Sequence, residues 1–105
     1  MIARTWHGVV PESKADDYFE YLKKTGVPGY ESTKGNRGIY ILRRTENFST
    51  HYLLITLWDS LESIRAFAGE NAEQARHYPE DDEYLLEREP LCTHYEVLMS
   101  PGRSV

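Results

Sequence analysis

The stretch HYLLITLWDSLESIRAF, residues 51–67, decides the fold of this 105-residue chain. Residues 51–58 are rich in leucine, β-branched and aromatic side chains, which predicts a strand, and the apolar side chains at both parities predict that both of its faces are covered. A helix is expected to begin at Asp59-Ser60, where Glu62 completes a capping-box pattern. Apolar residues then recur at helical spacing as far as Phe67. The stretch therefore predicts a buried strand that leads directly into an amphipathic helix.

The sequence on either side predicts the remaining elements by the same periodicities. Strands are expected at residues 2–10, 39–44 and 92–99, a short extended piece at 30–34, a polar hairpin loop at 45–50, a helix from Ser13 to the glycines at 26–29, and helical pieces at 70–78 and 80–87. The order β-α-β-β-α-β predicts an α+β fold, the ferredoxin-like sandwich. Residues 1–100 are expected to form one domain, followed by a C-terminal tail at 101–105.

Helices in this arrangement cover one face of the sheet and leave the other without cover. The strand at residues 51–58 is apolar on both parities, so the uncovered face carries apolar side chains. An exposed apolar sheet face is an association surface, and two-fold packing of sheet on sheet closes it. The sequence therefore predicts a homodimer formed through the sheet face.

Composition excludes several classes of partner and compartment. The chain has 12 basic and 17 acidic residues and a net charge of −5, which argues against nucleic acid binding. Its longest uncharged apolar run, residues 52–58, is far shorter than the roughly 20 residues of a membrane span. Residues 1–7 lack the layout of a signal peptide. Cys92, the single cysteine, is expected to be a buried thiol, and the protein is expected to be cytoplasmic.

No common cofactor or metal motif is found in the sequence. The four histidines, His7, His51, His77 and His94, lack the spacing of a zinc site. The glycines at 35 and 38 precede a strand and predict a turn rather than a phosphate loop. The acidic run at 80–83 fits the start of a helix, where acidic side chains are favourable, better than a calcium loop. We therefore predict no metal, flavin or nicotinamide cofactor.

Three features resemble the antibiotic biosynthesis monooxygenase superfamily. They are the junction Leu57-Trp58-Asp59-Ser60, the helix that follows it to Phe67, and the final strand with His94-Tyr95-Glu96-Val97. The resemblance covers residues 2–98 and implies a dimeric α/β barrel with a pocket between sheet and helices in each subunit. Members of the superfamily include cofactor-free oxygenases of aromatic compounds and heme-degrading monooxygenases.

The resemblance also suggests site residues, position by position. In the heme-degrading branch the site combines an Asn, a Trp and a His ligand, and these positions fall here on His7, Phe67 and His77. Only the histidine is retained, so weak heme binding at most and no ring cleavage are expected. For His77 a solvent-facing position is the alternative to a place in the pocket. For His7 the alternatives are the dimer core and the pocket.

The resulting hypothesis is a cofactor-independent monooxygenase acting on a small aromatic or enolisable substrate. His7 or His77 is the predicted base, because imidazole titrates near neutral pH. The predicted substrate-binding residues are aromatic: Trp6, Trp58, Phe67, Tyr84 and Tyr95. The alternative is a dimeric protein of the same fold that binds a small hydrophobic ligand without catalysis. A polar group within reach of the ligand favours the enzyme, and a pocket filled by its own aromatic rings favours the alternative.

Overall fold

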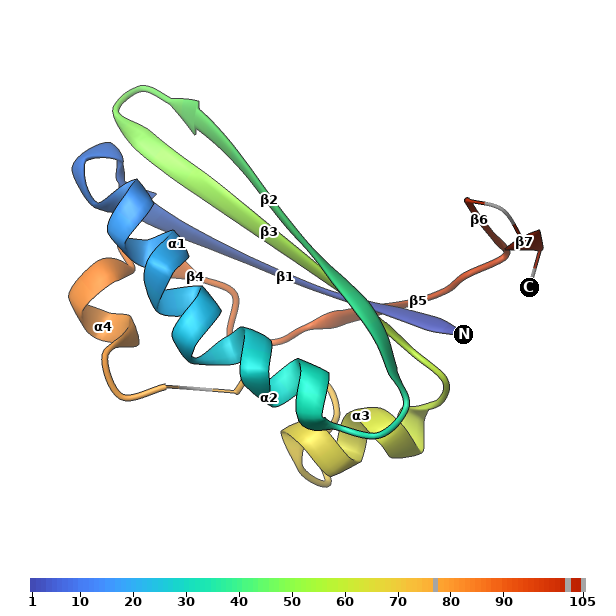
Figure 1. Cartoon of the computed structure of the whole chain (residues 1–105). Helices are drawn as coiled ribbons and strands as arrows, with labels where there is room; N and C mark the ends of the chain where they lie inside the picture. Colours follow the sequence, from blue (N-terminus) through green and yellow to red (C-terminus); the bar gives the residue numbers. More distant parts are fainter. Residues whose placement is uncertain (77, 102, 105) are drawn as a thin grey trace.

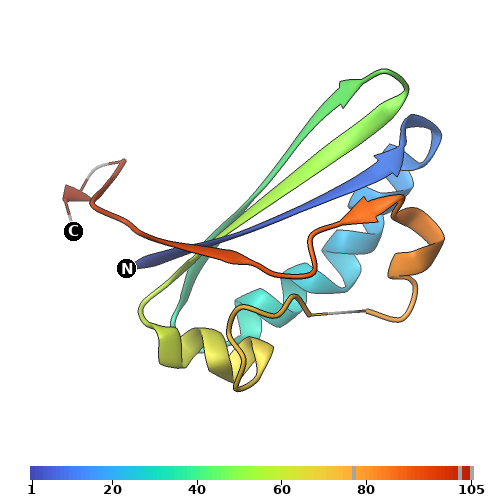
Figure 2. The ribbon, with the colours of Figure 1, turned by 180° about the vertical axis from the view of Figure 1, so that it is seen from behind.

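The computed structural model describes residues 1–76, 78–101 and 103–104, and its centre is an antiparallel five-stranded sheet. Figures 1 and 2 show this sheet from its two sides. The order is β2-β3-β1-β4, and β5 also pairs with β1. The strands are β1 (Ile2–Pro11), β2 (Asn36–Glu46), β3 (Ser49–Trp58), β4 (Glu87–Arg88) and β5 (Thr93–Glu96). A separate two-stranded sheet pairs β6 (Met99–Ser100) with β7 (Arg103–Ser104).

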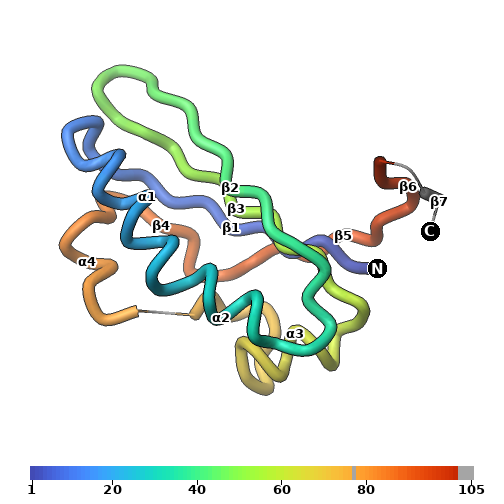
Figure 3. The backbone as a smooth tube through the Cα atoms, viewed as in Figure 1, coloured from blue at the N-terminus to red at the C-terminus, as the bar shows by residue number. Residues whose placement is uncertain are grey.

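The helices lie on one side of the sheet, as the tube in Figure 3 makes clear. They are the 3-10 turn η1 (Glu12–Lys14) and the helices α1 (Ala15–Lys24), α2 (Gly26–Ser32), α3 (Leu61–Ala68) and α4 (Asp81–Tyr84). None of the helices in the described part of the chain has the length and apolar character needed to cross a bilayer. The predicted α+β sandwich is confirmed by this arrangement.

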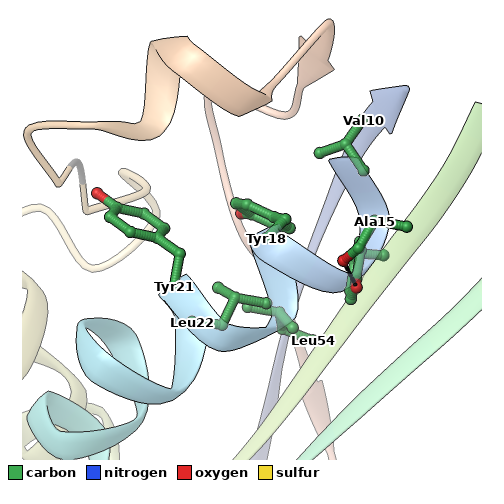
Figure 4. Close-up of a cluster of buried hydrophobic side chains, with 7 residues drawn as sticks. Val10, Ala15, Tyr18, Tyr21, Leu22 and Leu54 are labelled. Carbon is green, nitrogen blue, oxygen red and sulfur yellow. Dashed lines mark hydrogen bonds between the residues drawn. The ribbon is translucent and has the colours of Figure 1, made fainter. Parts of the chain in front are cut away.

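Two clusters of buried side chains fill the space between sheet and helices. In the first, Tyr18 and Leu22 of α1 pack against Val10, Tyr52 and Leu54 of the sheet, a cluster seen in Figure 4. The second cluster lies under α2 and α3 and contains Tyr30, Trp58, Ile64, Phe67 and Ala72. The predicted core strand is therefore central, because β3 contributes to both clusters.

Alternation along the strands divides the sheet into a helix face and an open face. On β3, Tyr52, Leu54 and Trp58 are buried on the helix face, whereas Leu53 is 37% exposed on the open face. The open face is formed by alternate residues of the three long strands and of β5, among them Ala3, Thr5, His7, Val9, Tyr40, Leu42, Arg44, His51, Leu53, Ile55, Leu57, Thr93 and Tyr95. The sequence predicts that both faces of β3 are covered. Within a single chain only the helix face is covered.

The connections differ most from the sequence-based expectations. The predicted loop at 45–50 is a two-residue turn, Asn47-Phe48, with φ values of 52° and 65° that fit a type I′ hairpin turn. The predicted extended piece at 30–34 is mostly the helix α2, which accommodates Pro28 in its first turn, where a proline removes no intrahelical hydrogen bond. Both predictions were wrong: Asn47-Phe48 makes a tight turn without a glycine, and Gly26, Pro28 and Gly29 lie within helix α2 rather than ending helical structure.

The segment after α3 also differs from the prediction. Residues 70–76 form no helix and instead bond to the chain that follows α4, through Ala75 N to Pro90 O (3.1 Å) and Cys92 N to Glu73 O (2.6 Å). The predicted helix at 80–87 is reduced to Asp81–Tyr84, and Glu87 begins strand β4 instead. The predicted strand at 92–99 is divided between Thr93–Glu96 and the start of β6 at Met99. The expected cap of α3 is present at Ser60, whose Oγ accepts a hydrogen bond from Ser63 N (3.3 Å).

Candidate functional site

A cavity lies between the helix face and the helices, at the place where the sequence predicts a pocket. Its wall is largely aromatic, with Trp6, Tyr18, Tyr30 and Tyr78 among the lining residues. Its polar lining residues are Arg4, Arg76, Asp81 and Cys92. The free volume is about 30 Å³, which is room for a water molecule or two. The protein's own aromatic side chains therefore occupy most of this space.

Arg4 is the most deeply buried charged group of the site. It lies on the helix face of β1 and is 3% exposed. Its Nε donates to Ala72 O at 3.4 Å and its Nη2 to Gln74 O at 3.0 Å. A buried guanidinium needs such acceptors, because an unpaired charge in the interior is strongly unfavourable. Arg4 therefore holds the segment after α3 over the cavity.

Arg76 places a second guanidinium beside the same rings. Its Cζ lies 4.9 Å from the centre of the Phe67 ring and 5.3 Å from that of Tyr78, and Nη1 donates to Phe67 O at 3.4 Å. Arg4 lies over the Phe67 ring as well, at 5.8 Å. Cations over aromatic faces are attracted by the ring electrons. The site thus combines two positive charges with a stack of aromatic side chains.

The hydroxyl groups around the cavity are uncharged donors. Burial raises the pKa of Tyr18, Tyr30 and Tyr78, so all three phenols keep their protons at neutral pH. The buried hydroxyl of Tyr78 has no hydrogen-bond partner among the described residues, while its backbone N donates to Asp81 Oδ2 at 2.8 Å. Tyr78 therefore offers a free polar group at the cavity.

Cys92 is buried, as predicted, and burial raises the pKa of its thiol. The side chain lines the cavity as a small neutral group. A thiol in this state is a poor nucleophile, because the thiolate is the reactive form.

Comparisons with known proteins identify the fold. No family model and no curated protein matches this chain in sequence. Among solved structures, a Bacillus cereus protein assigned as an antibiotic biosynthesis monooxygenase aligns with a TM-score of 0.67 at 15% identity, covering 95% of this chain and 94% of that one. The chain has the antibiotic biosynthesis monooxygenase fold. A mutant of MhuD, solved with two manganese protoporphyrin IX molecules per active site, aligns with a TM-score of 0.60 at 19% identity, covering 96% of this chain and 99% of that one.

Of the aromatic residues predicted to bind substrate in this monooxygenase fold, Trp6 lines the cavity. Its Nε1 donates to Glu89 O at 2.9 Å. Trp58 and Phe67 lie behind the cavity wall, with ring centres 5.7 Å apart, and Trp58 is fully buried with its Nε1 bonded to Thr56 Oγ1 at 2.8 Å. These two side chains support the wall from the second core cluster.

The other two predicted aromatic residues lie elsewhere. Tyr84 of α4 stacks on Tyr21, with ring centres 5.1 Å apart, and lines a groove outside the cavity. Tyr95 is 57% exposed and pairs with Ala3 on the open face. The structure therefore does not bring Tyr84 and Tyr95 together with Trp6.

The predicted bases are separated from the cavity or lie outside the described residues. His7 lies on the open face, where its Nε2 is 2.9 Å from His51 Nδ1. The sheet stands between His7 and the cavity, so the structure does not place His7 in the pocket, and its place in a dimer core stays a prediction. His77 lies outside the described residues.

Sequence reasoning missed Arg4, Tyr30 and Asp81, which line the cavity. A signal for Arg4 was present, because it shares its strand parity with Ile2 and Trp6, which are apolar. A charged residue within an apolar parity indicates a buried charge with a specific partner. Within residues 1–76, 78–101 and 103–104, no group of three metal-ligating side chains is present.

Proposed function

We propose that this chain is a cofactor-independent monooxygenase that acts on a small aromatic or enolisable substrate at the cavity between sheet and helices. The observation that carries the proposal is the pairing of Arg4 and Arg76 with aromatic walls at this cavity. Aromatic walls suit a flat ring, and guanidinium groups stabilise an oxygen anion on that ring. The fold likeness to an antibiotic biosynthesis monooxygenase supports the same chemistry.

The proposed reaction begins with removal of a proton from the substrate. The resulting phenolate or enolate is held by the guanidinium of Arg76, with the free hydroxyl of Tyr78 as a further donor. The electron-rich carbon reacts with dioxygen, and an activated CH₂ group becomes a carbonyl with release of one water molecule. His77 remains the predicted base of this step, and it neighbours Arg76 and Tyr78 in the sequence.

Substrate entry requires the chain over the cavity to move. Pockets for organic ligands usually measure about 300–1,000 Å³, whereas this cavity has about 30 Å³. Residues 72–76 form no helix, and they are held by the side chain of Arg4 and by backbone hydrogen bonds to the segment at 90–92. We propose that this segment moves aside when substrate binds and that a substrate anion competes with its carbonyl groups for Arg4.

A porphyrin does not fit the residues that form this cavity. Its macrocycle is far larger than the free volume, and Trp6, Tyr18 and Tyr30 occupy the remaining space. No described histidine lines the cavity: His7 and His51 lie on the other face of the sheet, and His94, which pairs with Arg4, is outside the lining. Heme therefore has no part in the reaction proposed for this cavity.

We further propose that the protein is a homodimer that buries the apolar part of the open face. Tyr40, Leu42, Leu53 and Tyr95 are between 37% and 57% exposed there. Exposed apolar side chains on one flat sheet are an association surface. A second copy of the chain provides the same surface and closes the contact by two-fold symmetry.

Oxygen uptake with a panel of phenols and 1,3-diketones tests the proposed function. We expect uptake in the wild-type protein and a loss of at least tenfold in Arg76→Met, because the anion loses its counter-charge. Arg65→Met is the matched control, since Arg65 is an exposed residue of α3 outside the cavity lining. Equal rates in wild type and Arg76→Met contradict the proposal.

The predicted base is tested in the same assay. His77→Ala is expected to lower turnover by about 10²–10⁴-fold, the usual contribution of a general base, with an unchanged melting temperature. His7→Ala should leave the reaction at the cavity intact, because the sheet separates the two. Full oxygen uptake by His77→Ala removes this residue from the mechanism.

The small free volume favours one alternative, a binding protein without catalysis. In that case the wild-type protein binds aromatic anions in equilibrium dialysis but consumes no oxygen with any of them. Arg76→Met then weakens the binding of aromatic anions, and neither protein consumes oxygen. The two outcomes separate the enzyme from the binding protein.

A further inference from the structure

Gly8 of β1 provides a notch behind the aromatic wall of the cavity. It is buried on the helix face of the strand, two residues after Trp6. A Cβ atom at position 8 would lie 2.5 Å from Cη2 and 3.0 Å from Cζ3 of the Trp6 ring, and 3.0 Å from Leu85 Cδ2. Carbon atoms in contact are normally about 3.5–4.0 Å apart. The far edge of the indole therefore occupies the space that a side chain at position 8 would fill.

The backbone of Gly8 does not itself require glycine. The described glycines with a positive φ are at positions 35, 38 and 69, whereas Gly8 lies within β1 and pairs with Tyr52. Glycine weakens the interior of a strand, and it often marks a place where another group approaches the backbone closely. At this position the approaching group is the ring of Trp6.

Contacts on two sides fix the indole ring. Its Nε1 donates to Glu89 O at 2.9 Å, and its far edge lies on Gly8 and against Leu85. Backbone hydrogen bonds from residues 86 and 89 to β1 hold the contacting segment in place. Trp6 is therefore a fixed wall of the cavity, in contrast to residues 72–76, which the proposed function requires to move.

Trp6 also separates the cavity from the notch. It lines the cavity, whereas Gly8 and Leu85 do not. The ring packs against the first core cluster, while Arg76 lies beside Phe67 of the second. A substrate whose anion is held at Arg76 therefore meets the indole at its opposite end.

We infer that Trp6 determines the size of the substrate and that Gly8 is the positioning residue for its ring. The inference rests on the proposed function, because it concerns the substrate of the same cavity. With the indole in the notch, the space between Trp6 and Arg76 suits a phenol or enol of one ring. A fused second ring has no room, because the indole ring is fixed.

Substitutions at the two positions should offset one another. Trp6→Phe lacks the atoms that lie on Gly8, so it leaves the notch empty and joins it to the cavity. Gly8→Ala fills the notch and forces the indole toward the cavity. In Gly8→Ala/Trp6→Phe the new methyl group occupies the notch and the smaller ring does not need it, so the size of the cavity returns to that of the wild type.

Equilibrium dialysis with 4-nitrophenol and 4-nitro-1-naphthol at mildly alkaline pH tests the inference. Both probes are anions under these conditions and differ by one fused ring. We expect the wild-type protein to bind 4-nitrophenol more tightly by on the order of tenfold, as for a pocket without room for the added group. Trp6→Phe should abolish or reverse this preference. Gly8→Ala should weaken the binding of both probes, and the double variant should regain the wild-type affinity and preference.

Two further measurements distinguish positioning of the ring from a general loss of stability. The difference in emission between Gly8→Ala and the double variant isolates Trp6, and it should be shifted relative to the difference between wild type and Trp6→Phe. Thr5→Ala is the matched control, an alanine substitution next to Trp6 in the chain but on the open face, and it should change neither emission nor preference. If Gly8→Ala does not fold, Trp6→Phe should restore folding in the double variant.

Four results overturn the inference. They are an unchanged preference in Trp6→Phe, losses that add in the double variant, unshifted Trp6 emission in a folded Gly8→Ala, and a double variant that stays unfolded. Dialysis needs no oxygen, so a protein that binds the probes without consuming oxygen still tests the role of Trp6. Failure of the wild-type protein to bind either anion overturns the proposed site and this inference together.

Discussion

The two faces of the central sheet differ in what limits access to them. On the helix face, Tyr52, Leu54 and Trp58 are buried, and the cavity beside them has room for little more than a water molecule. On the open face, Leu53 is 37% exposed and a hollow beside it measures about 340 Å³. The side chains of adjacent residues of one strand therefore lie in two different environments.

This difference explains why the histidine and arginine residues have separate surroundings. Arg4 is buried on the helix face and bonded to backbone carbonyl groups, and the more exposed Arg76 lies beside the Phe67 ring on the same side. His7 and His51 lie on the open face, where the pair is partly buried within one chain. A sheet with side chains of period two keeps these groups apart, although Arg4 and His7 are only three residues apart in the chain.

The largest difference is expected when a carboxylate replaces one of two neighbouring leucines of β3, one on each face of the sheet. Leu54→Asp should unfold the chain, because loss of a buried leucine costs about 2–5 kcal/mol and the buried carboxylate adds to this. Leu53→Asp should leave a folded chain and abolish the proposed dimer. Circular dichroism and light scattering measure the two effects, and similar behaviour of both variants contradicts the division into faces.

A smaller effect is expected when the buried guanidinium is removed. Arg4→Met should lower the free energy of unfolding by about 1–3 kcal/mol, because Ala72 O and Gln74 O lose their hydrogen-bond donor. Arg37→Met is the control, since Arg37 forms its ion pair with Asp59 in solvent and its removal should change stability little. Urea denaturation measures both, and an equal loss in the two variants argues against Arg4 as the anchor of residues 72–76.

Alkaline pH should lower the free energy of unfolding through the buried tyrosines of the helix face. Burial raises the pKa of Tyr18 and Tyr30 above the ordinary value of 10.0. The unfolded chain therefore loses these protons first, and stability declines as pH rises above about 10. Urea midpoints at pH 8 and pH 10.5 measure the decline. Tyr30→Phe should reduce it, and Tyr95→Phe, on the open face, should not.

The smallest effect is expected in the hairpin turn, which belongs to neither face. Phe48 has φ 65° and is 85% exposed. Phe48→Gly should stabilise the protein by up to about 1 kcal/mol, because glycine adopts this conformation without steric cost. Thermal denaturation measures the gain, and oxygen uptake should stay as in wild type. A loss of stability means that the exposed ring of Phe48 makes a contact that one chain does not show.

The three long strands and α3 were predictable because their patterns are long and regular, whereas the two-residue strand β4 falls partly in a predicted helix. The run at residues 51–58 gave β3 within two residues of its observed start, and the Ser60 cap marked the beginning of α3. The connections were not predictable in the same way. Asn47-Phe48 contains no glycine, and nothing local indicates that residues 70–76 bond to a segment near Pro90 and Cys92.

The position of the candidate site was predictable, but several of the residues that line it were not. The pocket between sheet and helices was expected, and Trp6 lines it. The parity of Arg4 with Ile2 and Trp6 indicated a buried charge, but its acceptors at Ala72 and Gln74, like the place of Asp81 at the cavity, depend on long-range contacts. His7 and His51 illustrate the same limit, since 43 residues separate them in the chain and only the strand register places their rings side by side.

The two tryptophans give this protein a built-in pair of optical reporters. Trp58 is fully buried and its indole N–H is bonded to Thr56 inside the second core cluster, so its emission follows folding and is shielded from quenchers. Trp6 lies at the cavity wall and is only partly buried, so its emission follows the contents of that cavity. A fluorescence titration thus records ligand entry and loss of structure in one sample, without any label.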